Sequence, residues 1–202
     1  MLTSYTMAPE VDGRRESALF TIAKRELSTA ASVTPAMKPG TPTLVSVRLE
    51  IAAVGARPRG AFDELAQLYL KRMAPLVPGG AKTGVDAPVY KSEEALWEAI
   101  EQDRARTAAL VVLLDERGKS MTSEAFAQWL GQERDRGRQR IVFALGPADG
   151  WSTESRKRAG WLLSLSTMTL AHELARVVLC EQIYRALTIL AGHPYHRSGR
   201  KE

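Results

Sequence analysis

From residue 48 onward, the hydrophobic residues follow two patterns, which take turns along the chain. Short apolar-rich runs are typical of strands that are covered on both faces. Such runs predict strands at 48–54, 109–114, 140–145 and 163–168. Between them, apolar residues recur at helical spacing and predict helices over 60–73, after Ser92, from Thr122, after Ser152 and over 173–191. Strands that alternate with helices predict an α/β fold, with a mostly parallel sheet and helices on both faces.

The segment 1–46 does not share this pattern. Its stretch 28–43 consists largely of Ser, Thr, Ala, Pro and Gly, and prolines at 35, 39 and 42 prevent a continuous helix there. We expect 1–46 to be a flexible extension, or the result of a start assigned too far upstream, and 47–202 to form the folded domain.

Composition narrows the class of protein. The chain has 202 residues, of which 45% are hydrophobic and 25% charged, as is ordinary for a soluble globular protein. No apolar run approaches the roughly 18 residues of a membrane helix, so no membrane partner is expected. The single cysteine, Cys180, lies on an apolar helix stripe, which predicts core packing, no metal cluster and a reducing, cytoplasmic setting. With 28 Lys and Arg against 23 Asp and Glu, the net charge of +5 permits a nucleic-acid partner.

In parallel α/β sheets, ligands bind beyond the carboxyl ends of the strands. Here those ends fall at 114–115, 146–150 and 167–172, and we expect them to converge on one site. The glycines of GPADG at 146–150 would let a ligand approach the backbone, although an ordinary tight turn explains them equally well. The dinucleotide fingerprint and the P-loop signature are both missing, which disfavours a nucleotide-binding enzyme of another α/β family.

Two further groups of residues could carry chemistry. His172 starts the last predicted helix and Arg176 follows one turn later, so an imidazole and a guanidinium share one helix face. The stretch HPYHR at 193–197 mixes aromatic and cationic side chains that suit base stacking and phosphate pairing, with a solvated tail as the alternative. The four tryptophans are expected on helix faces in the core.

Four stretches together resemble one family. These are RLEIAAVG at 48–55, LLDERGK at 113–119, GPADG at 146–150, and 163–197, which contains MTLAHELARVVLCEQIYRA followed by GHPYHR. The sequence resembles the RlmH family of SPOUT-superfamily RNA methyltransferases over about 48–197. The resemblance implies methyl transfer from S-adenosylmethionine to N3 of pseudouridine 1915, in helix 69 of 23S ribosomal RNA, within the large subunit or the 70S ribosome. It also implies a C-terminal trefoil knot and a homodimer with the active site at the subunit interface.

The resemblance also assigns site residues by position. It places cofactor contacts at Leu114, Gly146, Leu165, Ser166, Thr167, Met168, Thr169 and Leu170. It places catalytic roles at His172, Arg176 and His196, and RNA contacts at Arg185, Tyr195, His196 and Arg197. Chemically, His172 suits a base for the N3 proton, and Arg176 or Arg185 would stabilise the anion that results. Tyr195 or His196 offers a surface on which a base could stack.

Departures from the family pattern leave rival hypotheses open. The family has a second glycine in this turn where this chain has Pro147, which lacks a backbone N–H. The family also has a proline where this chain has Ala171. One rival is a non-catalytic RNA- or ribosome-binding module that kept the fold and lost affinity for the cofactor. Another is a SPOUT methyltransferase with a different RNA target. Calorimetry with the cofactor and mass spectrometry of ribosomal RNA separate these hypotheses.

Overall fold

The structure is a computed structural model that describes residues 47–77, 85–104 and 107–196. The expected extension 1–46 lies outside the described residues. So do residues 78–84 and Arg197 of the predicted RNA-binding tail.

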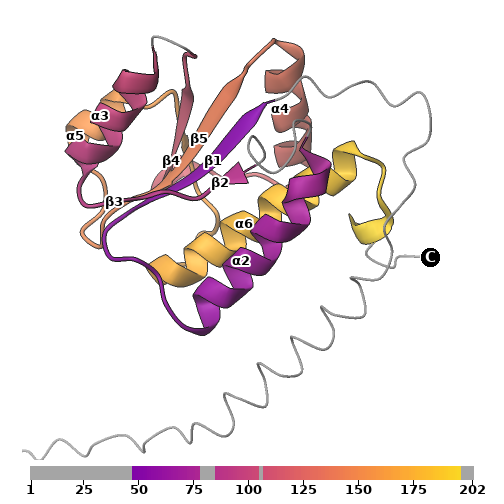
Figure 1. Ribbon diagram of the computed structural model, residues 1–202, viewed down its shortest axis with the longest axis horizontal. Coiled ribbons are helices and arrows are strands. Elements are labelled where there is room, and N and C mark those ends of the chain that lie inside the picture. Colours follow the sequence, from indigo (N-terminus) through magenta and orange to yellow (C-terminus); the bar gives the residue numbers. More distant parts are fainter. Residues whose placement is uncertain (1–46, 78–84, 105–106, 197–202) are drawn as a thin grey trace, which may run out of the picture. The chain divides into compact units, whose positions relative to one another are not determined.

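The described strands form a six-stranded parallel sheet (Figure 1). Their order is β2 (Val85–Asp86), β1 (Arg48–Val54), β5 (Arg140–Leu145), β4 (Leu110–Lys119) and β6 (Trp161–Leu163), while β3 (Val89–Tyr90) pairs with the end of β1. All of β5 and nearly all of β1 are buried, because helices cover both faces of the sheet. The predicted α/β class and parallel pairing are therefore confirmed.

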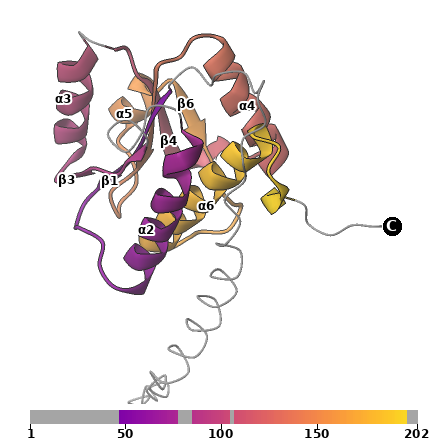
Figure 2. The same cartoon turned by 45° about the vertical axis from the view of Figure 1, so that its right-hand side comes forward.

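Helices lie on both sides of this sheet (Figures 1 and 2). One face is covered by α2 (Ala61–Met73), α6 (His172–Leu190) and α4 (Ser123–Asp135), with α6 packed between the other two. The other face is covered by α3 (Glu93–Arg104) and the short α5 (Thr153–Arg158). Short 3-10 turns follow α2 at Ala74–Leu76 and α6 at Pro194–His196. None of the helices in the described ranges combines the length and apolarity that a membrane crossing needs.

Side chains from the two faces of the sheet enter two apolar cores. Ile51 and Phe143 pack under α2, α4 and α6, whereas Val142 and Ala144 belong to the core beneath α3. Cys180 of α6 is fully buried in the first core, as the sequence predicted. Desolvation raises the pKa of its thiol to about 12, so this cysteine is a packing residue.

The helix starts carry the capping residues that the sequence indicated. The hydroxyl oxygens of Ser92, Thr122 and Ser152 each accept a hydrogen bond from the backbone N–H three residues later, at 3.3, 3.1 and 3.0 Å. These bonds satisfy amides that have no partner within the helix.

The strand predicted at 163–168 is wrong. β6 ends at Leu163, and residues 164–171 are irregular. The hydroxyl of Ser164 donates to the carbonyl oxygen of Ser166 at 2.9 Å, and the hydroxyl of Ser166 accepts from the N–H of Met168 at 2.9 Å. Such local bonds compete with a strand ladder for the backbone groups of this segment.

Two smaller predictions also need correction. Trp97 and Trp129 lie on helices, but Trp151 precedes α5 and Trp161 begins β6. In addition, β4 continues to Lys119 rather than ending near Leu114. Polar residues supply this extension, so a search for apolar runs could not detect it.

Candidate functional site

The carboxyl ends of β5, β4 and β6 lie side by side. Strand register places Leu114 of β4 opposite both Leu145 of β5 and Leu163 of β6. The segments that leave these positions, 115–119, 146–152 and 164–171, therefore start at the same edge of the sheet. We call them the three bends. Together with Leu114, they contain all the predicted cofactor contacts, so these contacts start from one edge of the sheet, and their role in binding stays a prediction.

The first bend folds across the end of β6. Lys119 aligns with Leu163, which also aligns with Leu114, and the carbonyl oxygen of Lys119 accepts a hydrogen bond from the N–H of Ser164 at 3.2 Å. A Cβ atom added at Gly118 would lie 2.6 Å from the backbone of Leu163, so the crossing requires glycine here. The trefoil knot stays a prediction.

A buried carboxylate fastens the first bend to α5. Asp115 accepts from the backbone N–H of Arg117 at 2.9 Å through one oxygen. Its other oxygen accepts from Nε of Arg156 at 2.7 Å. The side chain of Asp115 is only 3% exposed, so the pair holds the bend where water competes little.

Trp151 links the second bend to Leu114 of β4, and sequence reasoning missed it. Its indole Nε1 donates to the carbonyl oxygen of Leu114 at 2.9 Å. Its ring lies against Gly146, where an added Cβ would be 3.0 Å from two ring atoms. The only available signal was an aromatic residue directly after the glycine turn. The Trp151 ring therefore borders the surface that Leu114 and Gly146 present to a ligand, and we call this surface the cradle.

Glu93 at the start of α3 binds the end of the second bend through hydrogen bonds. Its carboxylate accepts from the N–H of Ser152 at 3.0 Å and from the hydroxyl of Ser152 at 2.7 Å. It also accepts from the hydroxyl of Ser155. Partial burial favours a higher pKa for Glu93, but the hydrogen bonds from Ser155 and Ser152 outweigh it and lower the pKa.

The third bend leaves its middle open to a ligand. Thr167, Met168 and Thr169 are exposed, while Leu165, Ser166 and Leu170 are half-buried. Gly146 faces the same edge without a side chain, and Leu114 is half-buried beside it. Backbone donors and acceptors beside a glycine and apolar side chains suit an adenosyl group. The residues present therefore fit the cofactor that the resemblance implies.

His172 and Arg176 stand at the start of α6, directly after the third bend. Nε2 of His172 is buried and finds no hydrogen-bond partner within the described part of the chain. The side chain of Arg176 is 4% exposed, and its Nη1 donates to Oδ1 of Asp63 on α2 at 2.7 Å. The sequence predicted the histidine and the arginine on one face, but it did not reveal Asp63, which is 113 residues away.

The predicted RNA-binding residues lie further along α6. The hydroxyl of Tyr195 donates to Glu181 at 3.2 Å, and its ring packs edge-on against Tyr184 with 4.7 Å between centroids. Arg185 also pairs with Glu181, and its guanidinium lies 5.1 Å from the centre of the Tyr195 ring. Desolvation raises the pKa of the Tyr195 hydroxyl, which stays protonated as a donor.

The structure does not bring this tail to His172 within one chain. Glu181 follows His172 by nine residues on the same helix, which corresponds to about 13 Å of helix length. The backbone of His196 ends the last 3-10 turn, while Arg197 lies outside the described residues.

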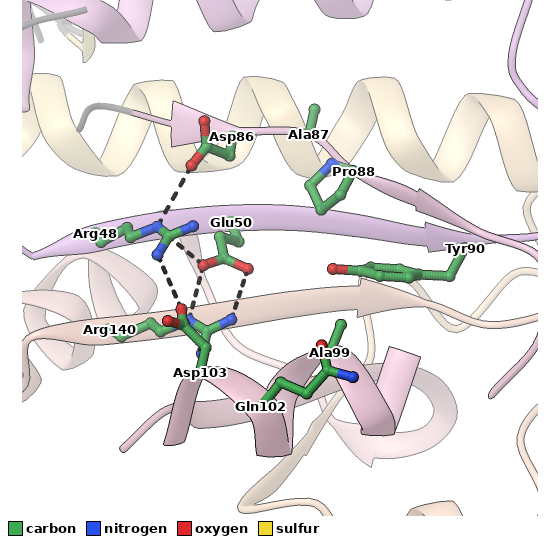
Figure 3. A pocket seen from close by; sticks show the side chains of 10 residues that line it. All are labelled: Arg48, Glu50, Asp86, Ala87, Pro88, Tyr90, Ala99, Gln102, Asp103 and Arg140. Atoms are coloured by element: carbon green, nitrogen blue, oxygen red, sulfur yellow. Dashed lines mark hydrogen bonds and ion pairs between the residues drawn. The ribbon is translucent and has the colours of Figure 1, made fainter. Parts of the chain in front are cut away.

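A cavity of about 750 Å³ lies at the opposite edge of the sheet, beside the first residues of β1 and β5 (Figure 3). Arg48, Glu50, Arg140 and Asp103 line it as a closed ring of ion pairs, at 3.1, 2.7, 3.1 and 3.0 Å in turn. Each charge of this ring has an opposite partner, so the ring ties α3 to the two strands. Asp86 adds a third carboxylate, 3.4 Å from Arg48, and the buried Nη1 of Arg140 makes no hydrogen bond within the described residues.

Comparisons with known proteins point to one family. The family described as "Predicted SPOUT methyltransferase" matches residues 47–196. Ribosomal RNA large subunit methyltransferase H of Koribacter versatilis is 48% identical over 151 residues, which cover 74% of this chain and 98% of that protein. The protein of the same name from Allorhizobium ampelinum is 41% identical and covers 75% of this chain and 100% of its own. The crystal structure of the SpoU methyltransferase AviRb from Streptomyces viridochromogenes aligns with a TM-score of 0.43 and 16% identity, over 79% of this chain and 66% of that one.

Proposed function

Because the chain belongs to the SPOUT methyltransferase family, we propose that it methylates N3 of pseudouridine 1915 in helix 69 of 23S ribosomal RNA. The two relatives named ribosomal RNA large subunit methyltransferase H support this target, since this chain matches nearly their whole length. The observation that carries the proposal is the buried Nε2 of His172, which has no hydrogen-bond partner in the described ranges and directly follows the third bend.

The three bends and Leu114 would hold S-adenosylmethionine. The backbone at Gly146 and along 165–170 would contact its adenosyl part, and Leu114 would pack against it. When bound, this cofactor supplies an electrophilic methyl group. The indole of Trp151 keeps Leu114 and Gly146 in place, so the cradle exists before binding.

His172 and Arg176 would activate the acceptor. A neutral imide nitrogen is a poor nucleophile, so the N3–H bond of the pseudouridine ring must break first. Nε2 of His172 would accept this proton. The guanidinium of Arg176, held by Asp63, would stabilise the negative charge left on the ring.

We also propose that a homodimer completes the site in the cytoplasm, where ribosomal RNA is found. The exposed apolar side chains Phe62, Met168 and Leu174 gather around the starts of α2 and α6 and the third bend, and a partner would cover them. The partner would also supply the Tyr195 tail, which lies too far along α6 to meet its own His172. Arg185, Tyr195, His196 and Arg197 would then contact the RNA, with His196 near the reacting base.

Two measurements test this function. Mass spectrometry of ribosomal RNA from a deletion strain should show pseudouridine 1915 without its N3 methyl group, and the wild-type gene should restore it. A methyl group that persists in the deletion strain would exclude this target and favour another RNA. Calorimetry of the wild-type protein with S-adenosylmethionine should show binding heat, and its absence would favour a non-catalytic module.

His172→Asn tests the base directly. We expect this variant to bind S-adenosylmethionine as the wild type does, while methyl transfer to a ribosomal substrate falls by about 100-fold or more. Transfer at the wild-type rate would show that another group accepts the proton.

A further inference from the structure

Most arginines of the described chain form an ion pair with a carboxylate, as Arg156 does with Asp115. Arg57, Arg59 and Arg117 differ. All three are exposed, and no carboxylate pairs with them in the parts of the chain that the structure describes. A guanidinium without an internal partner keeps its planar set of N–H donors available to an acceptor from outside.

These three arginines share one edge of the molecule. Arg57 and Arg59 lie in the loop 55–60 that leaves β1, and Arg117 lies in the first bend, which continues β4. Because β1 and β4 both pair with β5, their ends lie about 10 Å apart, with Gly146 leaving β5 between them. The unpaired cations therefore belong to segments that leave the sheet on either side of β5.

The loop 55–60 presents its arginines on a restricted backbone. Gly55 and Gly60 bound the loop with positive φ values of 129° and 73°, which only glycine adopts without strain. Pro58 sits between the arginines and fixes its own φ angle. A loop restricted in this way loses less conformational entropy when a ligand binds.

We infer that Arg57, Arg59 and Arg117 form an arginine rim that binds RNA phosphates on both sides of the nucleotide delivered to His172. The inference rests on the proposed function, because it assigns the surface that receives the same RNA. Phosphate oxygens match the planar guanidinium with two parallel hydrogen bonds. Contacts of this kind position the RNA backbone without reading its sequence.

The test measures how salt weakens binding of a fluorescently labelled RNA hairpin with the helix 69 sequence. Each phosphate contact contributes about 0.7–0.9 to the slope of log affinity against log salt concentration. R57A/R59A should therefore lower the slope by about 1.4–1.8, and R117A by about 0.7–0.9. R57K/R59K should retain the slope, because lysine keeps the charge.

K71A/R136A is the matched control. Lys71 and Arg136 are exposed cations at the ends of α2 and α4, at the opposite edge of the sheet, and Glu133 keeps Arg138 as a partner when Arg136 is removed. This control removes the same charge as R57A/R59A and should leave the slope unchanged.

The outcomes separate the rim from the proposed function. Wild-type slopes in R57A/R59A and R117A would overturn the arginine rim, as would an equal loss in K71A/R136A. Slower methylation of ribosomal subunits with unchanged hairpin binding would overturn it too, in favour of an acidic protein partner. Binding of S-adenosylmethionine does not involve the rim. If calorimetry of the wild type with this cofactor shows no binding heat, the proposed function itself is rejected.

Discussion

The indole Nε1 of Trp151 donates a 2.9 Å hydrogen bond to the carbonyl oxygen of Leu114, and the same ring lies against Gly146. One side chain thus fixes the end of the apolar part of β4 relative to the turn that leaves β5. Because Trp151 is only 4% exposed, this arrangement is part of the fold and does not depend on a ligand.

Trp151→Phe keeps an aromatic ring and removes the N–H donor. We expect affinity for S-adenosylmethionine to fall by about fivefold, because one hydrogen bond contributes about 1 kcal/mol. Calorimetry measures the loss. Trp129→Phe on α4 is the control, since Trp129 lies away from the bends in the other core. Equal cofactor affinity in the two variants would contradict the role given to Trp151.

Gly118→Ala places a Cβ atom 2.6 Å from the backbone of Leu163, where no side chain can move aside. We expect a loss of about 1–3 kcal/mol in the free energy of unfolding, measured by denaturant titration. Gly131→Ala is the matched control, because an added Cβ there meets only the end of the Leu190 side chain, at 3.0 Å, and alanine favours the helix. The prediction is wrong if Gly118→Ala is as stable as Gly131→Ala.

Asp63→Ala removes the carboxylate that pairs with Arg176. The guanidinium is nearly buried, so we expect the free energy of unfolding to fall by about 1–3 kcal/mol and methyl transfer to slow. Asp63→Asn keeps an acceptor oxygen and should retain part of the stability and part of the methyl-transfer activity. Lys71→Ala changes an exposed position two turns further along α2 and should have little effect on either. Full activity in Asp63→Ala would show that Arg176 needs no positioning.

Glu93 makes part of the stability depend on pH. Its pKa is lower in the folded protein than the ordinary value of 4.5, because hydrogen bonds from Ser155 and Ser152 outweigh the effect of burial. The carboxylate therefore contributes stability above about pH 4.5, and this contribution is lost as the pH falls through the folded-state pKa. Thermal unfolding should show the wild type more stable than Glu93→Gln at pH 7, with the difference shrinking toward pH 3. A stability difference that does not change with pH would show that the ionised form of Glu93 contributes nothing.

Local patterns in the sequence predicted much of this fold. The apolar runs around Ile51 and Phe143 indicated buried strands, and the hydroxyls of Ser92, Thr122 and Ser152 marked helix starts. These predictions held because hydrophobic periodicity and helix capping depend on residues within a turn or two of each other. The same locality explains the failure at 163–168, where serine side chains bond to the nearby backbone and end the strand.

The sequence by itself determined the order of β1, β4 and β5 among the five described α-helices, and the edge at which the loops gather. Only the tertiary structure decided which side chains hold that edge together: Trp151 with Leu114, Asp63 with Arg176, and Glu93 with Ser152. These partners are 37, 113 and 59 residues apart. Hydrophobic periodicity records whether a residue is buried, whereas a specific pair depends on strand register and on how the helices pack across the sheet.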